Sequence, residues 1–264
     1  MKALNEKYLN HKIFERLIEY SEFYNRLALH TFHWTSQGTR TLLNMDTYVY
    51  SSMQGTLESI HDVLKRGRIN DAYTLLRKFC DSTIINVYSN LYLQDHFSIE
   101  NFVVAKIENW RTGKEQIPYY GTMSQYIKNS PKLAPVNSLL NPTKKLYQEI
   151  RERCNMHTHY NFYATLLLND NEVNITDDRI KSLDQFSQDV EDVFIRHLSY
   201  IFYLMDHYMM ASDYIDSLNI GMPPEEGSEN FVEPFIQNML NKVVRAKRPD
   251  LYDLVKENTD RMLD

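Results

Sequence analysis

Cysteine, glycine and proline are all scarce in this chain of 264 residues, which has two cysteines, seven glycines and eight prolines. Cys80 and Cys154 are too few for a disulfide framework and do not form a CxxC pair. Few glycines and prolines argue against a turn-rich all-β fold, and a hydrophobic fraction of 43% argues against a disordered chain. We therefore expect a helical protein of a reducing, cytoplasmic compartment.

Long apolar segments are missing as well. Residues 1–20 mix charged and apolar side chains and lack the continuous apolar core of a signal peptide. No later segment approaches the roughly 20 apolar residues that a membrane-spanning helix needs, so we expect no membrane partner. The net charge of −6 gives no general attraction to phosphate backbones, so any nucleic acid must bind through a few local Arg and Lys side chains.

Apolar residues recur at helical spacing along most of the chain, which predicts an all-α antiparallel helical bundle. Outside the central segment discussed next, the predicted helices cover residues 12–32, 46–65, 69–93, 99–110, 123–128, 179–216, 231–247 and 249–263. Gly67 has the position of a C-cap glycine, and the short link around it favours an antiparallel helix pair.

A stretch rich in glycine, proline and acidic residues, GMPPEEGS at 221–228, interrupts the helical pattern near the C-terminus. It is the strongest boundary signal in the sequence. We therefore predict a helical bundle over residues 1–218 and a C-terminal helical extension over residues 219–264, packed on the same domain.

Residues 141–170 (NPTKKLYQEIRERCNMHTHYNFYATLLLND) form the stretch that departs most from ordinary core patterning. The pattern predicts one long helix, with Asn141 as N-cap and Pro142 at the first helical position. Its apolar stripe is interrupted by five polar side chains: Arg151, Arg153, Asn155, His157 and His159. Such a break in local consistency is typical of a functional segment.

These polar residues divide between two sides of the predicted helix. At about 100° per residue, Arg151, Asn155 and His159 form a stripe at positions i, i+4 and i+8 and point together toward a candidate cleft. His157 lies beside Cys154 on the packed side. For His157, a partly buried histidine that is hydrogen-bonded within the bundle is favoured over a catalytic role.

The segment resembles the signature helix of the HEPN superfamily, all-α proteins in which an Arg is followed, after four to six residues, by a His. Two registers fit this spacing, Arg153 with His159 and Arg151 with His157. The string RCNMHTHYN at 153–161 favours the first, with Asn155 as the polar residue behind the Arg because Cys154 directly follows Arg153. The segment GRINDAYTLLRKF at 67–79 resembles the preceding helix of the family, and the resemblance covers about residues 46–216.

The resemblance implies a HEPN-type bundle with additional N- and C-terminal helices and the activity of a metal-independent endoribonuclease. RNA would be cleaved by attack of its own 2′-hydroxyl in a homodimer cleft, without metal or cofactor. His159 would be the general acid–base, Arg153 would bind the scissile phosphate, and Asn155 would orient either group. A role as a toxin or in phage defence, with an antitoxin or regulatory protein as partner, is implied as well.

Geometry makes the dimer part of this hypothesis. Arg153 and His159 are six residues apart, so an ideal helix separates their directions by about 120°. One helix would then supply half a site, and a second copy would complete it. Arg151 and His157 remain as an alternative register or as substrate contacts.

Other interpretations stay open. Arg77 and Asp81, four residues apart on the preceding helix, are either accessory residues of the same cleft or an ordinary ion pair. A non-catalytic helical protein that binds RNA, a nucleotide or a protein partner is the alternative function. The third interpretation is purely structural, with the Arg and His side chains as hydrogen-bonding partners inside the bundle.

Overall fold

The computed structural model describes residues 6–140, 144–169 and 178–264. Within them the regular structure is helical, apart from an isolated antiparallel bridge between Met210 and Val232. The prediction of an all-α protein is therefore confirmed. In the same residues, no helix combines the length and the apolar character required to cross a bilayer.

The chain forms two compact units, each assembled from discontinuous segments. Unit 1 contains Met1–Ala28, Tyr48–Thr83 and Thr143–Phe194, and unit 2 contains Leu29–Thr47, Ile84–Pro142 and Ile195–Asp264. The four longest helices contribute residues to both units. The proposed division after residue 218 remains a prediction.

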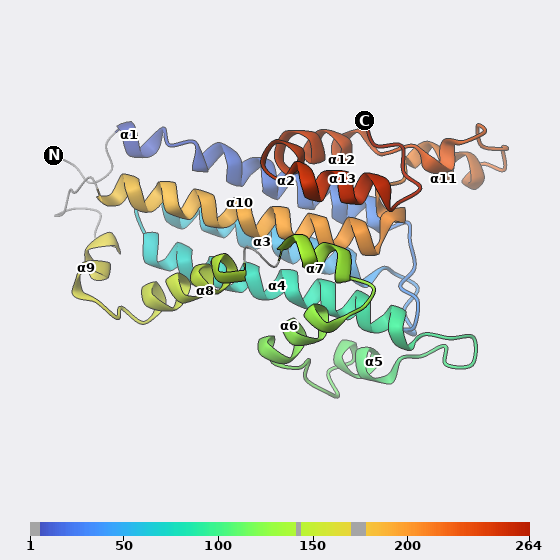
Figure 1. The fold of residues 1–264 in the computed structure, drawn as a ribbon, viewed down its shortest axis with the longest axis horizontal. Coiled ribbons are helices and arrows are strands. Elements are labelled where there is room, and N and C mark those ends of the chain that lie inside the picture. The colour runs from blue at the N-terminus through green and yellow to red at the C-terminus, as the bar shows by residue number, and fades with distance from the viewer. Residues whose placement is uncertain (1–5, 141–143, 170–177) are drawn as a thin grey trace. The chain divides into compact units, whose positions relative to one another are not determined.

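Unit 1 is built largely from parts of the four long helices, packed around aromatic side chains. These helices are α2 (Ile13–Thr31), α3 (Met45–Lys65), α4 (Ile69–His96) and α10 (Asp178–Leu204) (Figure 1). The shorter elements of the unit are α1 (Glu6–Leu9), α8 (Lys144–Thr158), α9 (Tyr163–Leu166) and the 3₁₀ turn η2 (Leu167–Asn169). In the core, the Tyr20 ring stacks on Phe194 with centroids 3.8 Å apart, and Phe79 meets Tyr24 edge-on. The large buried rings supply the main hydrophobic stabilisation of this unit.

Unit 2 combines the remaining parts of the long helices with many short elements. They are α5 (Ala105–Arg111), α6 (Tyr120–Asn129), α7 (Ala134–Leu140), η3 (Asp206–Met209), α11 (Ser212–Asn219), η4 (Ser228–Asn230), α12 (Pro234–Met239), the π-helical η5 (Leu240–Arg245) and α13 (Pro249–Glu257). Its core includes the fully buried side chains of Leu91, Val136, Leu198, Phe202 and Ile236.

Several predicted helix boundaries were wrong; for example, the helix predicted over 99–110 begins only at Ala105. The helix predicted over 179–216 ends at Leu204, because Met205 leaves the helical region (φ −128°, ψ 58°) before η3 and α11 begin. The helix predicted over 231–247 begins only at Pro234 and passes into a π-helix. Helix α7 was not among the predicted helices; Pro135 lies in its first turn, where no backbone donor is lost.

The central helix is the most important correction. Predicted over 141–170, it ends at Thr158, while its expected caps, Asn141 and Pro142, lie outside the described residues. Tyr160 adopts a left-handed conformation (φ 48°), and the Asn161 N–H donates to the carbonyl oxygen of Met156, five residues back, at 3.3 Å. This is the hydrogen bond of a Schellman C-cap.

The end of α3 shows the same C-cap with its usual residue. Gly67 has φ 77°, as the C-cap prediction requires, and Arg68 N–H donates to Val63 at 3.0 Å. At the end of α8 a tyrosine occupies the glycine position, where a left-handed L-residue costs about 1–2 kcal/mol. The chain therefore accepts backbone strain immediately after His159.

Candidate functional site

Helices α4 and α8 lie side by side in unit 1 and are joined by a ladder of polar side chains (Figure 1). Its three pairs, each about one helical turn from the next, are Thr74 with Thr158, Arg77 with Asn155, and Asp81 with Arg151. Residue numbers rise along α4 as they fall along α8, so the two helices are antiparallel. The ladder brings both predicted accessory residues to the stripe that carries Arg151 and Asn155.

The ladder is partly open to solvent. Arg151 donates from Nη1 to Oδ1 of Asp81 at 2.5 Å, and the two side chains are 22% and 36% exposed. Arg77 donates from Nη1 to the side-chain oxygen of Asn155. Because a partly exposed ion pair contributes little net stability, a phosphate can compete for these guanidinium groups at small cost.

Arg153 points to a different neighbour. Its Nε and Nη2 donate to the two carboxylate oxygens of Asp189 on α10, at 2.9 and 2.6 Å. Asp189 is completely buried, and it also accepts from Gln185 at 2.9 Å. Burial of the guanidinium opposes its charge, but the hydrogen bonds to Asp189 outweigh burial and raise the pKa of Arg153. The guanidinium therefore stays charged, and its two hydrogen bonds to Asp189 fix α8 against α10.

His157 is a buried, neutral histidine. Its ring stacks on Tyr73 with centroids 3.9 Å apart, and its Nδ1 lies 2.7 Å from Oδ1 of Asn70. The side-chain N–H of Asn70 donates to the carbonyl of Thr165, so the Asn70 Oδ1 faces the imidazole. Because this oxygen can only accept, the proton of the neutral His157 ring is on Nδ1. Burial and then the charge of Arg153 lower the pKa of His157 to about 4.

His159 lies just beyond α8 and is exposed. Its backbone N–H donates to the Asn155 carbonyl at 3.0 Å, so it continues the helical direction of the Arg151–Asn155 stripe. Its imidazole makes no hydrogen bond to a residue that the structure describes. Among the predicted site residues, it is thus the most accessible to a substrate.

The cysteine beside these residues does not add a nucleophile. Cys154 is completely buried between its polar neighbours. Burial, and next the charge of Asp189, raise the pKa of its thiol to about 12. The thiol is therefore protonated at neutral pH, and Cys154 serves as a small packing residue.

The structure thus separates the predicted residues into two groups. Arg151 and Asn155 meet Arg77 and Asp81, on the same stripe as the exposed His159. Arg153 and His157 instead share Tyr73, which stacks on the imidazole and donates its hydroxyl to Asp189 at 3.4 Å. We call these groups the α8 stripe (Arg77, Asp81, Arg151, Asn155 and His159) and the Tyr73 cluster (Asn70, Tyr73, Arg153, His157, Gln185 and Asp189).

Sequence reasoning missed Asn70, Tyr73 and Asp189. Asp189 had a detectable signal, because it falls on the apolar stripe of its helix between Phe186 and Val193, both buried. A carboxylate at such a position needs a partner, and an Arg on a neighbouring helix is the usual one. Asn70 and Tyr73 gave no signal of this kind, since polar and aromatic residues near a helix start are common.

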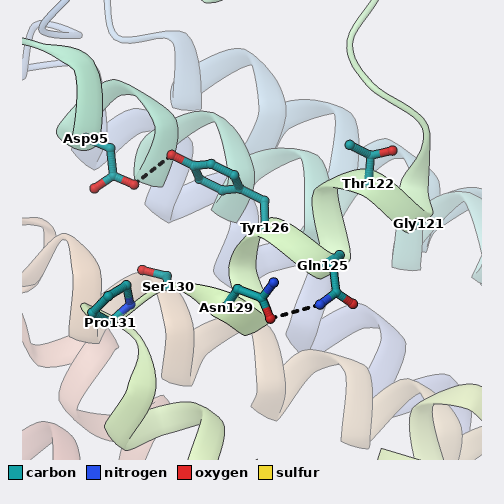
Figure 2. A pocket seen from close by; sticks show the side chains of 8 residues that line it. All are labelled: Asp95, Gly121, Thr122, Gln125, Tyr126, Asn129, Ser130 and Pro131. Atoms are coloured by element: carbon teal, nitrogen blue, oxygen red, sulfur yellow. Dashed lines mark hydrogen bonds between the residues drawn. The ribbon is translucent and has the colours of Figure 1, made fainter.

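Two pockets formed by described residues of unit 2 lie apart from the predicted site residues. The larger, about 750 Å³, is lined by Asp95 and residues of α6 and the following turn (Figure 2). Much of its polar lining is mutually paired, since Tyr126 donates to Asp95 at 2.7 Å and Gln125 donates to Asn129 at 2.8 Å. Within the described residues, no group of three or more His, Cys, Asp and Glu side chains gathers to hold a metal ion.

Comparisons with known proteins do not assign the chain to a family. No family model, curated protein or solved structure matches it significantly. The HEPN resemblance therefore rests on the residues of this chain alone.

We expect His157 to make the protein sensitive to acid. A buried histidine whose pKa falls from 6.5 to about 4 stabilises the fold above pH 6.5, and this contribution is lost as the pH falls to 4. The free energy of unfolding should therefore drop by about 3 kcal/mol over this interval on account of His157. Denaturant titrations of wild type and His157→Gln at pH 7 and pH 4.5 measure the difference.

His159→Gln is the matched control, because its side chain is exposed two residues away. It should leave the acid-dependent loss as large as in wild type. An unchanged loss in His157→Gln would show that this imidazole is not the group responsible.

Proposed function

We propose that the protein is a metal-independent endoribonuclease of the HEPN type that acts through the α8 stripe. The observation that carries the proposal is the alignment of two partly exposed guanidinium groups, Arg77 and Arg151, with an exposed imidazole, His159, along one edge of the α4–α8 pair. Phosphate binding and proton transfer are the two chemical tasks of RNA cleavage, and this edge offers a side chain for each.

The reaction follows from these groups. His159 removes the proton of a ribose 2′-hydroxyl, whose oxygen attacks the adjacent phosphorus. The bond to the 5′-oxygen breaks, and a protonated imidazole returns a proton to that leaving oxygen. Arg151 and Arg77 hold the phosphate oxygens and stabilise the added negative charge of the transition state. The products are a 2′,3′-cyclic phosphate and a free 5′-hydroxyl.

Arg153 has a positioning role in this proposal. Two of its guanidinium nitrogens are committed to the buried Asp189, which leaves Nη1 as its remaining edge. By fixing α8 to α10, it holds the stripe in place. This departs from the simplest reading of the family motif, in which Arg153 itself binds the scissile phosphate.

A second copy of the chain supplies the other half of the site in this proposal. Large apolar side chains follow His159 and are open to solvent: Tyr160, Phe162, Tyr163 and Leu166, of which Tyr163 is 77% exposed. Apolar surface of this kind is typical of an interaction site. Pairing two copies through this segment, residues 160–166, would bury it and place two His159 side chains near one interface.

The dimer is tested by removing the exposed rings. Phe162→Ser combined with Tyr163→Ser should give a monomer in size-exclusion chromatography with light scattering, and RNA cleavage should be lost with it. The fold should survive, because both rings are largely exposed. Leu42→Ser with Ile99→Ser, at positions of unit 2 that are even more exposed, should leave the dimer intact. A monomeric wild type would contradict the two-copy site.

RNA cleavage without metal tests the function itself. The purified protein, incubated with total RNA in EDTA, should produce fragments that end in 2′,3′-cyclic phosphates. Intact RNA after prolonged incubation with the folded dimer, with or without added Mg²⁺, would overturn the catalytic proposal. The biological role in toxicity or phage defence and the antitoxin partner would then have no chemical basis.

The second candidate is a non-catalytic helical protein that binds RNA, a nucleotide or a protein partner. It is favoured by the engagement of Arg153 and Asn155 with neighbours in the same chain and by the neutral, buried state of His157. Retention of labelled RNA by the folded protein without cleavage would support it.

A further inference from the structure

Unit 2 holds a pocket of about 460 Å³ that the proposed ribonuclease site does not use. It lies where the turn after α2 meets α4 and the end of α10, and its lining includes Trp34, Asn90, Gln94, Phe97, His207 and Tyr208. Aromatic rings and uncharged amides thus dominate the wall. This composition is typical of a site for a small planar ligand.

Trp34 carries a donor without an acceptor. Its Nε1 is buried and has no hydrogen-bond partner, although indole N–H groups usually find one when buried. The ring is held in place edge-on to His207, with centroids 5.1 Å apart. Because this nitrogen is buried, a ligand in the pocket would meet the indole ring rather than its N–H.

Two amides supply acceptors. Asn90 uses its N–H₂ group on the Asp46 carboxylate and the Asn86 carbonyl, both at 3.0 Å. Gln94 donates to the Leu204 carbonyl at 2.9 Å. The Oδ1 of Asn90 and the Oε1 of Gln94 are left without a hydrogen-bond partner in the described part of the chain.

The lining carries no unpaired charge. Asp206 is its one charged side chain, and it is bound by Arg261 through Nε and Nη2 at 3.2 and 3.1 Å. Burial lowers the pKa of His207, so its ring is neutral at pH 7. An anion such as free phosphate therefore finds no cation here, and a neutral ligand is the better match.

We propose that this pocket binds a neutral purine base that carries an exocyclic amine. The two amide oxygens would accept from the amine, and the aromatic side chains would contact the flat face of the base. The proposal does not depend on RNA cleavage, because it concerns different residues and a different readout.

The two tryptophans of the chain, Trp34 and Trp110, make a direct test possible. In Trp110→Phe, all tryptophan fluorescence comes from the pocket. Adenosine should quench it in a saturable way, and purine riboside, which lacks the amine, should bind about tenfold more weakly for the loss of one or two hydrogen bonds. Adenosine 5′-monophosphate should bind no more tightly than adenosine.

Gln94→Leu in the same background removes one acceptor. It should lower the affinity for adenosine about tenfold and leave the affinity for purine riboside unchanged. Gln125→Leu is the matched control, since this glutamine is also exposed but lines the separate pocket of Figure 2. This variant should bind adenosine with the same affinity as Trp110→Phe. Equilibrium dialysis of adenosine against Trp34→Ala, which removes the aromatic ring from the pocket wall, provides a second measurement and should show weaker binding.

Fluorescence that stays constant up to the solubility limit of adenosine, in a protein with an unchanged circular dichroism spectrum, would overturn the proposal. Equal affinity for adenosine and purine riboside would overturn the assignment of the amine contacts. Equal weakening by Gln94→Leu and Gln125→Leu would show that binding takes place elsewhere.

Discussion

Arg153→Ala is expected to lower the free energy of unfolding by about 3–5 kcal/mol, the usual cost of leaving a buried carboxylate without its charged partner. The reason is the environment of Asp189, which is completely buried and loses both hydrogen bonds from the guanidinium. Only the donors of Gln185 and Tyr73 would remain to satisfy it. Denaturant titration at pH 7, followed by circular dichroism, measures the loss.

Arg151→Ala is the matched control on the same helix. Its ion pair with Asp81 is partly exposed, so the expected loss is below about 1 kcal/mol. Arg153→Met combined with Asp189→Leu should recover most of the stability, because replacing a whole buried pair by apolar residues is often neutral. Equal losses in Arg153→Ala and Arg151→Ala would mean that Asp189 does not depend on Arg153.

His159→Ala is expected to reduce the rate of RNA cleavage in EDTA by a factor of about 10²–10⁴, the range typical of a lost general acid–base. The side chain is exposed and makes no hydrogen bond to a described residue, so stability and dimer mass should stay unchanged. The readout is the initial rate of cyclic-phosphate formation at saturating RNA. A structural role for His159 would change stability and leave this rate intact.

His157→Gln separates the two histidines in the same assay. His157 is buried and neutral, so its replacement should change the rate far less than His159→Ala once folding is confirmed. Arg151→Ala should slow cleavage while the protein remains folded. If His157→Gln abolished cleavage and His159→Ala did not, the active imidazole would belong to the Tyr73 cluster.

The long helices could be predicted from the sequence because periodic apolar residues determine them directly. Helices α2, α3 and α4 begin within one residue of the predicted positions, and Gly67 ends α3 as its C-cap position requires. The end of α8 was not predictable in the same way. Tyr160, Phe162, Tyr163 and Leu166 continue an apolar pattern, yet Tyr160 takes the left-handed conformation that a sequence normally assigns to glycine.

The division of the polar residues between two groups was only partly predictable. Helical spacing correctly placed Arg151 and Asn155 on one side and His157 on the packed side. The partner of Arg153 was not found, because Asp189 lies 36 residues further along the chain and nothing local connects the two. Tertiary pairing of this kind depends on how α10 packs on α8, which the sequence pattern of either helix does not contain.

The ion pair of Arg153 with the buried Asp189 has a consequence for the evolution of the chain. Losing either residue alone is costly, whereas exchanging both for apolar residues is nearly neutral, so the two positions should change together among descendants of a common ancestor. An Arg retained at position 153 only where Asp is retained at 189 would reflect packing. An Arg retained at 153 after Asp189 has been replaced would reflect selection for a contact with substrate. Arg153 would then have the role that the family motif implies, binding of the scissile phosphate.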